Sequence, residues 1–162
     1  MRPFREIFWV AGLWLTVASL TGSEPLVVET FNARRGIVVA GHPQAAAAGL
    51  AVLKAGGNAI DAGVATALAI GVAEPYGSGL GGKLVLLYYE AASGRTFAVD
   101  ALDACGSAME VERYRQLPEE IRSYGYGSVC VPGFAAGLWL AHEKWGRLKW
   151  SECLAPAIDL AR

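Results

Sequence analysis

Charge of either sign is scarce in this chain. Only 18% of the 162 residues are Asp, Glu, Lys or Arg, and the formal net charge at pH 7 is -1. Binding to a nucleic-acid backbone requires a concentration of Lys and Arg on one face, and the sequence has no basic stripe that could supply it. We therefore expect no nucleic-acid partner.

Cysteine and histidine are also scarce. The three cysteines, Cys105, Cys130 and Cys153, are too few and too widely spaced for a disulfide framework or a zinc knuckle. Because their number is odd, at most one bridge can form, in an oxidising compartment. The interpretation that we favour is three buried or half-buried thiols acting as small hydrophobic residues. His42 and His142 have no ligand-type neighbours, so the sequence predicts no metal site, and nothing in it calls for a cofactor.

The N-terminus has the composition of a secretory signal. Arg2 and Arg5 form a positive region, residues 7–20 carry no charge, and residues 21–23 are small, as at a cleavage site. The alternative, an uncleaved anchor, requires roughly 20 apolar residues, which is more than this run provides. We expect residues 1–23 to be a signal peptide, no stable membrane anchor, and a periplasmic or secreted location.

Two helices are expected next. Residues 43–55 are rich in alanine, begin with a proline and stop at Gly56 and Gly57. A second helix starts at Asn58, has apolar residues recurring at helical spacing, and ends before Pro75. Its other face is nearly all alanine and glycine, which predicts burial on most sides and close approach of a second element.

A glycine-rich loop, "GSGLGGK" at residues 77–83, contains the spacing G-x-G-x-x-G. It precedes an expected β-hairpin, "LVLLYYE" and "TFAVD", whose first strand is apolar on both faces and so predicts a sheet covered on both sides. A nucleotide-binding fingerprint needs a strand before the loop and a helix after it. The order here is the reverse, which argues against a nucleotide site. The glycines then serve a tight turn with positive φ, or a close approach to another segment or a ligand.

The remaining chain alternates polar and amphipathic segments. Residues 110–128 mix charges of both signs with tyrosine and predict surface helix and loop. A helix is expected from Pro132 to Gly146, followed by another with Ser151 as its N-cap and Pro156 as a kink.

Two blocks of this sequence resemble the γ-glutamyltransferase family, also called γ-glutamyltranspeptidases. The first is "HPQAAAAGLAVLKAGGNAIDAGVATALAIGVAEPYGSGLGG" at residues 42–82, and the second is "VPGFAAGLWLAHEKWGRLKWSECLAPAIDLAR" at residues 131–162. The glycine, proline and acidic positions of both blocks follow the family's order and spacing. By this resemblance, residues 24–162 are the N-terminal portion of the family's large subunit.

The resemblance implies an α+β fold, the N-terminal part of an αββα-sandwich N-terminal nucleophile hydrolase, incomplete in this chain. The family's precursor cuts itself, and a threonine at the new N-terminus of the small subunit attacks a γ-glutamyl amide such as glutathione. The implied partners are that small subunit and a small-molecule amide. No catalytic residue is expected here, since Thr66 and Thr96 fall within a predicted buried helix and a strand.

One family position is altered. After the second hairpin strand the family carries an arginine that holds the substrate α-carboxylate, and Leu102 stands there in this chain. The substrate-binding candidates are Lys83, as a replacement cation, and Asp103, as the acidic neighbour. The substitution points to an acyl amide other than a standard γ-glutamyl compound.

Two further interpretations remain open at this point. The chain could be a short, non-catalytic relative that binds a partner through the surface its missing subunit would have covered, or the product of a decayed gene. A fragment without its other half should expose apolar patches and aggregate, whereas an adapted binding module should be monomeric and fold cooperatively.

Overall fold

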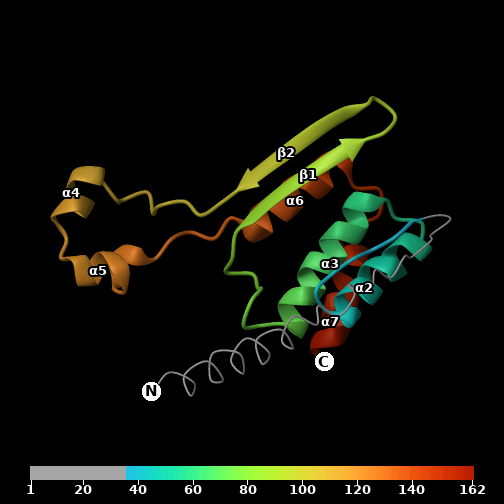
Figure 1. Cartoon of the computed structure of the whole chain (residues 1–162), viewed down its shortest axis with the longest axis horizontal. Helices are drawn as coiled ribbons and strands as arrows, with labels where there is room; N and C mark the ends of the chain where they lie inside the picture. The colour runs from blue at the N-terminus through green and yellow to red at the C-terminus, as the bar shows by residue number, and fades with distance from the viewer. Residues whose placement is uncertain (1–35) are drawn as a thin grey trace, which may run out of the picture. The chain divides into compact units, whose positions relative to one another are not determined.

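The structure, a computed structural model, describes residues 36–162, which form an α+β unit (Figure 1). The predicted signal peptide, residues 1–23, lies outside the described residues. In chain order the elements are α2 (Pro43–Lys54), α3 (Ala59–Ala73), β1 (Leu84–Glu90), β2 (Arg95–Ala101), α4 (Val111–Gln116), α5 (Glu119–Ser123), the 3-10 turn η1 (Tyr126–Ser128), α6 (Phe134–Trp145) and α7 (Trp150–Ala161). No helix among the described residues is long and apolar enough to span a membrane.

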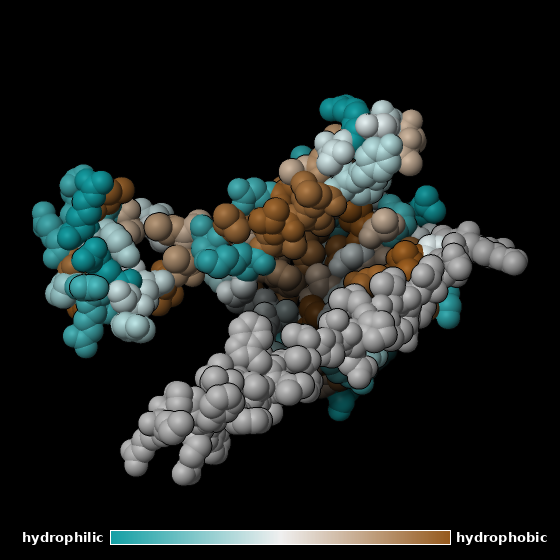
Figure 2. Space-filling model, viewed as in Figure 1, coloured by the Kyte–Doolittle hydropathy of each residue, from teal (hydrophilic) through white to brown (hydrophobic). Residues whose placement is uncertain are grey.

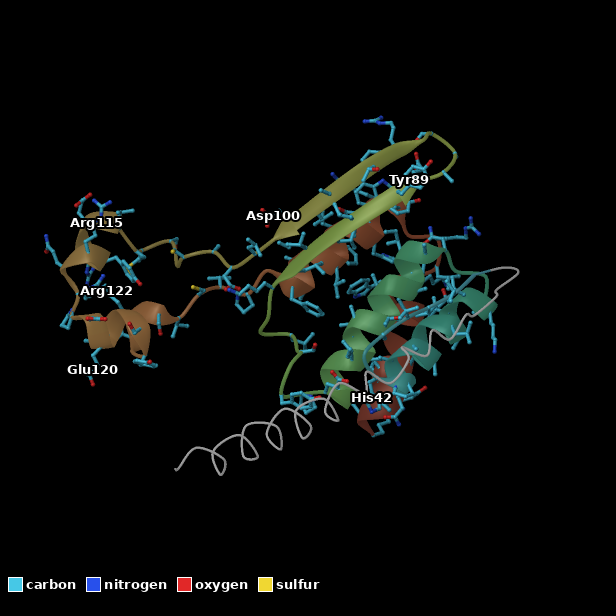
Figure 3. All side chains as sticks on the ribbon, viewed as in Figure 1. His42, Tyr89, Asp100, Arg115, Glu120 and Arg122 are labelled. Atoms are coloured by element: carbon cyan, nitrogen blue, oxygen red, sulfur yellow. The ribbon has the colours of Figure 1, made fainter. Side chains whose placement is uncertain are left out.

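Helix α2 begins and ends as its sequence predicts. His42, at the start of the helix in Figure 3, accepts a hydrogen bond at Nδ1 from the Gln44 N–H at 3.2 Å, and Pro43 occupies the first turn. The helix ends at Lys54, one residue before the predicted end, and Gly56 follows with φ of +97°. A left-handed residue of this kind is favoured by glycine and terminates a helix.

Helix α3 is capped by its own sequence and packs closely against α2. The Asn58 side chain accepts hydrogen bonds from the N–H groups of Ile60 and Asp61, and Asp61 accepts one from the Asn58 N–H, which completes a capping box. A Cβ atom built on Gly49 of α2 would overlap the Thr66 hydroxyl of α3. The predicted close approach of a second element is therefore confirmed.

The glycine loop joins a helix to a strand, as predicted, so the strand-then-helix order of a nucleotide site is absent from this part of the structure. Of the two alternatives for its glycines, positive φ does not apply, because Gly56 and Gly94 are the only described residues with positive φ. The glycine loop instead passes very close to helix α3. A Cβ on Gly71 of α3 would lie 3.2 Å from the Cα of Gly79.

Strands β1 and β2 form an antiparallel hairpin in which Leu84 pairs with Ala101 and Glu90 with Arg95. The expectation of a sheet covered on both faces was wrong for the described residues. Val85, Leu87 and Tyr89 of β1 are 64%, 75% and 63% exposed. Figure 2 shows hydrophobic residues gathered around β1. The alternation of side chains along a strand places these three on the face opposite the core.

Helix α6 lies against one face of the hairpin, and α7 packs beside α3 and α2 (Figure 1). Helix α6 begins at Phe134, and Pro132 lies just before its first turn, next to the N-cap residue Gly133. Lys149 and not Ser151 is the N-cap residue of α7, because the helix begins at Trp150 and Ser151 lies in its first turn. The Lys149 N–H donates to Glu152 Oε2 at 2.9 Å. Helix α7 continues through Pro156 as a single helix.

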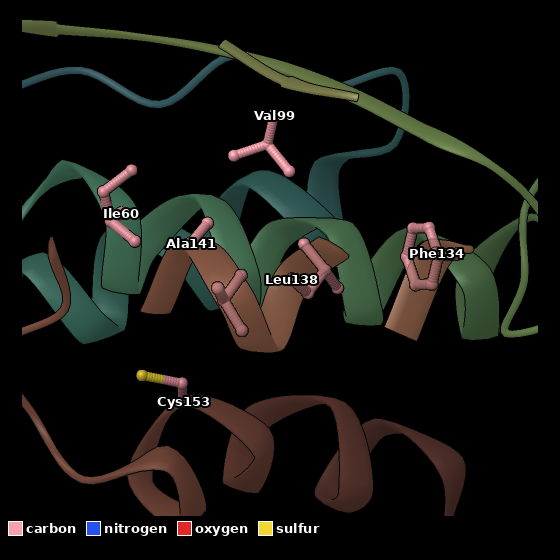
Figure 4. Close-up of a cluster of buried hydrophobic side chains, with 7 residues drawn as sticks. Ile60, Val99, Phe134, Leu138, Ala141 and Cys153 are labelled. Carbon is pink, nitrogen blue, oxygen red and sulfur yellow. The ribbon is translucent and has the colours of Figure 1, made fainter. Parts of the chain in front are cut away.

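The main hydrophobic core lies between the hairpin and the helices (Figure 4). Val99 points from β2 towards side chains of α3 and α6, and Cys153 lies on the α7 side. Its buried members are Ile60, Val64, Val99, Phe134, Leu138, Ala141 and Cys153. Helices α4 and α5 contain no buried residue, which confirms the surface character predicted for them, whereas Gly127 of η1 is buried.

Candidate functional site

The two predicted substrate-binding residues meet at the open end of the hairpin. Lys83 precedes β1 and Asp103 follows β2, and Lys83 Nζ lies 2.9 Å from Asp103 Oδ2. Their side chains are 63% and 23% exposed. The Leu84–Ala101 pairing brings the two chain segments together here, close to Asp100 in Figure 3. The ion pair forms because antiparallel pairing places the residues before one strand opposite those after the other.

The ion pair determines the charge state of this end of the hairpin. The hydrogen bond to Asp103 and then the negative charge of that carboxylate raise the pKa of Lys83 above 10.5. Lys83 is therefore a cation at neutral pH, with its charge already balanced by Asp103. An incoming carboxylate would have to compete with Asp103, but both groups are in contact with solvent, which screens their attraction.

Leu102 lies at the same end of the hairpin, where the resemblance implies an arginine. Its side chain is 51% exposed, and its N–H donates to Asp100 Oδ1 at 3.2 Å. Lys83, Leu102 and Asp103 are thus brought together as predicted. The position that would hold a guanidinium presents an apolar side chain to solvent.

The start of α6 fixes the position of this end. The Phe134 N–H donates to the carbonyl of Gly82 at 3.1 Å. A Cβ on Gly133 would overlap the carbonyl oxygens of Ala101 and Leu102, so only glycine fits between the helix start and the strand end. The site is therefore held by backbone contacts between the glycine loop, β2 and α6.

A second polar cluster, which the sequence did not predict as a site, surrounds the buried side chain of Asp61. Asp61 is 0% exposed, and its carboxylate accepts hydrogen bonds from the N–H groups of Asn58, Arg147 and Leu148 at 2.9–3.2 Å. These contacts tie the start of α3 to the connection between α6 and α7. The capping pattern Asn58-x-x-Asp61 was the local signal available, but the contacts with residues 147 and 148 are set by the fold.

His142 and Cys153 complete this cluster, since one ligand-type atom from each of Asp61, His142 and Cys153 lies within 4.8 Å of the others. Burial, with the nearby Asp61 carboxylate, raises the pKa of Cys153 to about 11, which keeps the sulfur protonated. His142 Nε2 lies 3.0 Å from the Leu148 carbonyl, which can only accept, so this nitrogen carries the proton. The three side chains thus belong to a buried polar network that links α3, α6 and α7, in which His142 Nε2 also lies 3.5 Å from Asp61 Oδ1.

The two threonines take structural positions. Thr66 Oγ1 donates to the Ala62 carbonyl within α3 at 2.8 Å, and Thr96 pairs with Tyr89 in the hairpin. The Thr66 hydroxyl is thus paired with a backbone carbonyl and not with a general base.

Residues 45–162 match the family model described as Gamma-glutamyltranspeptidase. The chain belongs to this family. Its predicted fold class is also confirmed, because solved members of the family superimpose on the described unit. A crystal structure of Helicobacter pylori gamma-glutamyltranspeptidase matches with a TM-score of 0.74 and 30% identity, over 83% of this chain and 39% of that one.

The sequence relatives include more than one activity name. The chain is 34% identical to a glutathione hydrolase proenzyme of Pseudomonas aeruginosa, over 93% of this chain and 27% of that protein. It is 41% identical to the Acylase ACY 1 proenzyme of Pseudomonas sp. strain SE83, over 78% of this chain and 24% of that protein. The chain therefore spans about a quarter of the length of these relatives, and the described unit corresponds to the N-terminal part of the family's αββα sandwich.

Proposed function

We propose that this chain is the N-terminal portion of an exported amide hydrolase or acyltransferase of the gamma-glutamyltranspeptidase family. It would act together with a small subunit of the same precursor, which supplies the threonine nucleophile. The family match over residues 45–162 supports this proposal, as do the proenzyme names of the relatives. By itself the chain is expected to be inactive.

The exposed outer face of β1 is the observation that supports a partner subunit. Three large apolar residues at alternate positions, Val85, Leu87 and Tyr89, are each more than 60% exposed in the described unit. Contiguous apolar surface of this kind marks an interaction site. In a sandwich of two sheets the opposite sheet covers such a face, with about 10 Å between them.

The open end of the hairpin bears on the choice of substrate. Leu102 offers no charge-assisted contact to an α-carboxylate, and the nearest cation, Lys83, is paired with Asp103. A relative named as an acylase is among the proteins most similar in sequence. We therefore propose an amide substrate whose acyl group does not depend on the α-carboxylate of a γ-glutamyl compound.

The test begins with the source DNA beyond the codon for Arg162. If the reading frame continues, the complete precursor is expressed and its self-cleavage into two subunits is followed by gel electrophoresis. Two matched substrates then separate the substrate classes: γ-glutamyl-p-nitroanilide and 4-aminobutyryl-p-nitroanilide, which differ only by the α-carboxylate. The proposal expects a kcat/KM for the second substrate at least equal to that for the first.

A Leu102→Arg precursor is the matched variant. It should raise kcat/KM for the γ-glutamyl substrate by on the order of 100-fold, the value of a charge-assisted carboxylate contact, and leave the other substrate unchanged. Equal rates for the two precursors on γ-glutamyl-p-nitroanilide would contradict the substrate assignment while leaving the amide hydrolase assignment intact. Absence of self-cleavage would contradict the hydrolase assignment itself.

A non-catalytic binding module is the second candidate, and the exposed β1 face favours it as well. It predicts that the reading frame stops after Arg162 and that the purified chain is monomeric and unfolds cooperatively. Export has its own test, which is N-terminal sequencing of the protein from its native source. A mature N-terminus close to residue 24 supports the signal peptide, and a retained Met1 contradicts it.

A further inference from the structure

Two exposed cysteines lie at the base of the lobe formed by α4, α5 and η1. The base is an isolated antiparallel bridge between Ala104 and Val131, which exchange both backbone hydrogen bonds, at 3.0 and 2.8 Å. Figure 1 shows the two chain segments that connect the lobe to the hairpin and to α6. Cys105 follows Ala104 and Cys130 precedes Val131, so the antiparallel register places the two cysteines opposite each other.

Cys105 and Cys130 flank this isolated bridge on its lobe side, and the ladder does not continue past them. In a regular antiparallel ladder the residues at these positions form a non-hydrogen-bonded pair, with Cα atoms about 4.5 Å apart and side chains on the same side. Disulfides join cysteines whose Cα atoms are roughly 4.4–6.8 Å apart. Cys105 and Cys130 also line one pocket of about 300 Å³ at the inner end of the lobe.

The third thiol is unsuited to pairing with either. Cys153 is 0% exposed within the main core, where its Sγ contacts Asp61 Oδ1 at 3.8 Å, whereas Cys105 and Cys130 are both exposed. This arrangement differs from the expectation of three buried or half-buried thiols. Burial raises the pKa of Cys153 to about 11, which disfavours its thiolate, and its sulfur is also closed off from an oxidant in solution. Disulfide exchange requires the thiolate, so the two exposed cysteines react first.

The lobe has little else to hold it at its base. Among residues 36–162, no backbone hydrogen bond joins the segment 105–130 to the rest of the unit. The Ala104–Val131 pair lies just beyond the two ends of this segment. A covalent link next to that pair would fix the two ends of the lobe together. Closing a loop of this length limits the conformations of the unfolded segment.

We propose that Cys105 and Cys130 form a disulfide bond that closes the lobe when the chain meets a disulfide oxidant. One cysteine thiolate attacks a glutathione disulfide, displaces one glutathione thiolate and forms a mixed disulfide. The second cysteine thiolate then attacks the protein sulfur of that mixed disulfide and displaces the other glutathione. The two cysteines lose two electrons and two protons, and the oxidant is reduced to two thiols.

A tryptic map without reduction tests the pairing directly, because Lys and Arg residues separate the three cysteines. Cys105 falls in the peptide 96–113, Cys130 in 123–144 and Cys153 in 150–162. The folded, reduced chain is incubated with glutathione disulfide at pH 8, unfolded, treated with iodoacetamide and digested. The expected result is peptide 96–113 joined to 123–144, a whole-chain mass lower by about 2 Da before alkylation, and an alkylated Cys153.

Control samples show what the fold contributes. Oxidation in concentrated urea should give all three pairings, and Cys153→Ala should leave the 105–130 link unchanged. Cys105→Ser should convert Cys130 to a glutathione adduct. The proposal is overturned if the folded wild-type chain gives separate glutathione adducts at both exposed cysteines, two alkylated cysteines, or a link to Cys153. These outcomes do not depend on the catalytic assignment, because no readout uses activity.

Discussion

At the scale of single residues, the buried carboxylate of Asp61 is the most constrained polar group described. It accepts hydrogen bonds from residues 58, 147 and 148 without exposure to water. Several backbone N–H groups share this one buried acceptor. Removal of the carboxylate would therefore leave all of them without a hydrogen-bond partner. Asp61 is therefore a structural centre of the unit.

Replacement of Asp61 should be costly. We expect Asp61→Ala to lower the free energy of unfolding by about 3–5 kcal/mol, because several backbone donors lose their acceptor in the interior. Urea denaturation of the two chains measures the difference. Asp159→Ala is the matched control, since the Asp159 side chain is 73% exposed and its loss should change stability by less than about 0.5 kcal/mol. Equal effects of the two substitutions would contradict the role of Asp61.

Cys153 makes stability depend on pH at the alkaline end. The folded state holds the thiol proton up to a pKa of about 11, above its ordinary value of 9.0, so the unfolded state releases its proton first as pH rises. The stabilising contribution is complete below pH 9 and is lost between about pH 9 and 11, by on the order of 2 kcal/mol. Denaturation across this range should show that loss for the wild-type chain, and a smaller one for Cys153→Ala.

The substrate-site residues show how far sequence reasoning extends at this scale. Lys83 and Asp103 were predicted as neighbours of Leu102, and the fold places all three at one end of the hairpin. Their pairing with each other was not predicted, because it depends on the strand register. The Asp61, His142 and Cys153 cluster was missed because Asp61 on α3 is far in sequence from His142 on α6 and Cys153 on α7.

At the scale of elements, helix ends and the hairpin could be predicted because their signals are local. Pro43, Gly56 and the Asn58 cap act within one turn, and helices α2 and α3 begin where these residues place them. Coverage of the hairpin could not be predicted in the same way. β1 has apolar residues on both faces, but coverage of a strand depends on which other elements pack against it, and these lie far away in the sequence or in another chain.

Glycine positions on α2 and α3 test the packing of this helix pair. Gly49→Ala should lower the free energy of unfolding by about 1–3 kcal/mol, because its Cβ would overlap the Thr66 hydroxyl and approach the Ala62 carbonyl to 3.0 Å. Gly63→Ala is the matched control in α3, where a Cβ meets nothing within 4 Å. It should raise stability by about 0.5–1 kcal/mol through helix propensity. Thermal or urea denaturation distinguishes the two, and a stabilising Gly49→Ala would contradict the close packing.

At the scale of the whole molecule, the outer face of the hairpin governs how the chain behaves alone. Leu87, at 75% exposure, lies in the middle of this face. We expect Leu87→Thr to reduce self-association of the isolated chain, measured by light scattering at increasing concentration, because it removes apolar surface but retains a residue favoured in strands. Val111→Thr, at a position 63% exposed in α4, should have little effect.

In the complete precursor, Leu87→Thr should be harmful to stability, although it should benefit the isolated chain by reducing its self-association. If the small subunit covers β1, Leu87→Thr removes a buried apolar contact and should lower the melting temperature of the assembled protein. An unchanged melting temperature, together with an unchanged tendency of the isolated chain to associate, would contradict the proposed partner surface.

The contacts of Asp61 also constrain the order in which the polypeptide can acquire its structure. Asp61 receives its backbone donors from residues 86 and 87 positions later in the chain. During synthesis on the ribosome, α3 therefore leaves the exit tunnel long before its buried carboxylate can be satisfied. The α2–α3 pair can form early, but full burial of Asp61 must wait for residues 147 and 148, so the last step in folding of this unit is expected late in translation.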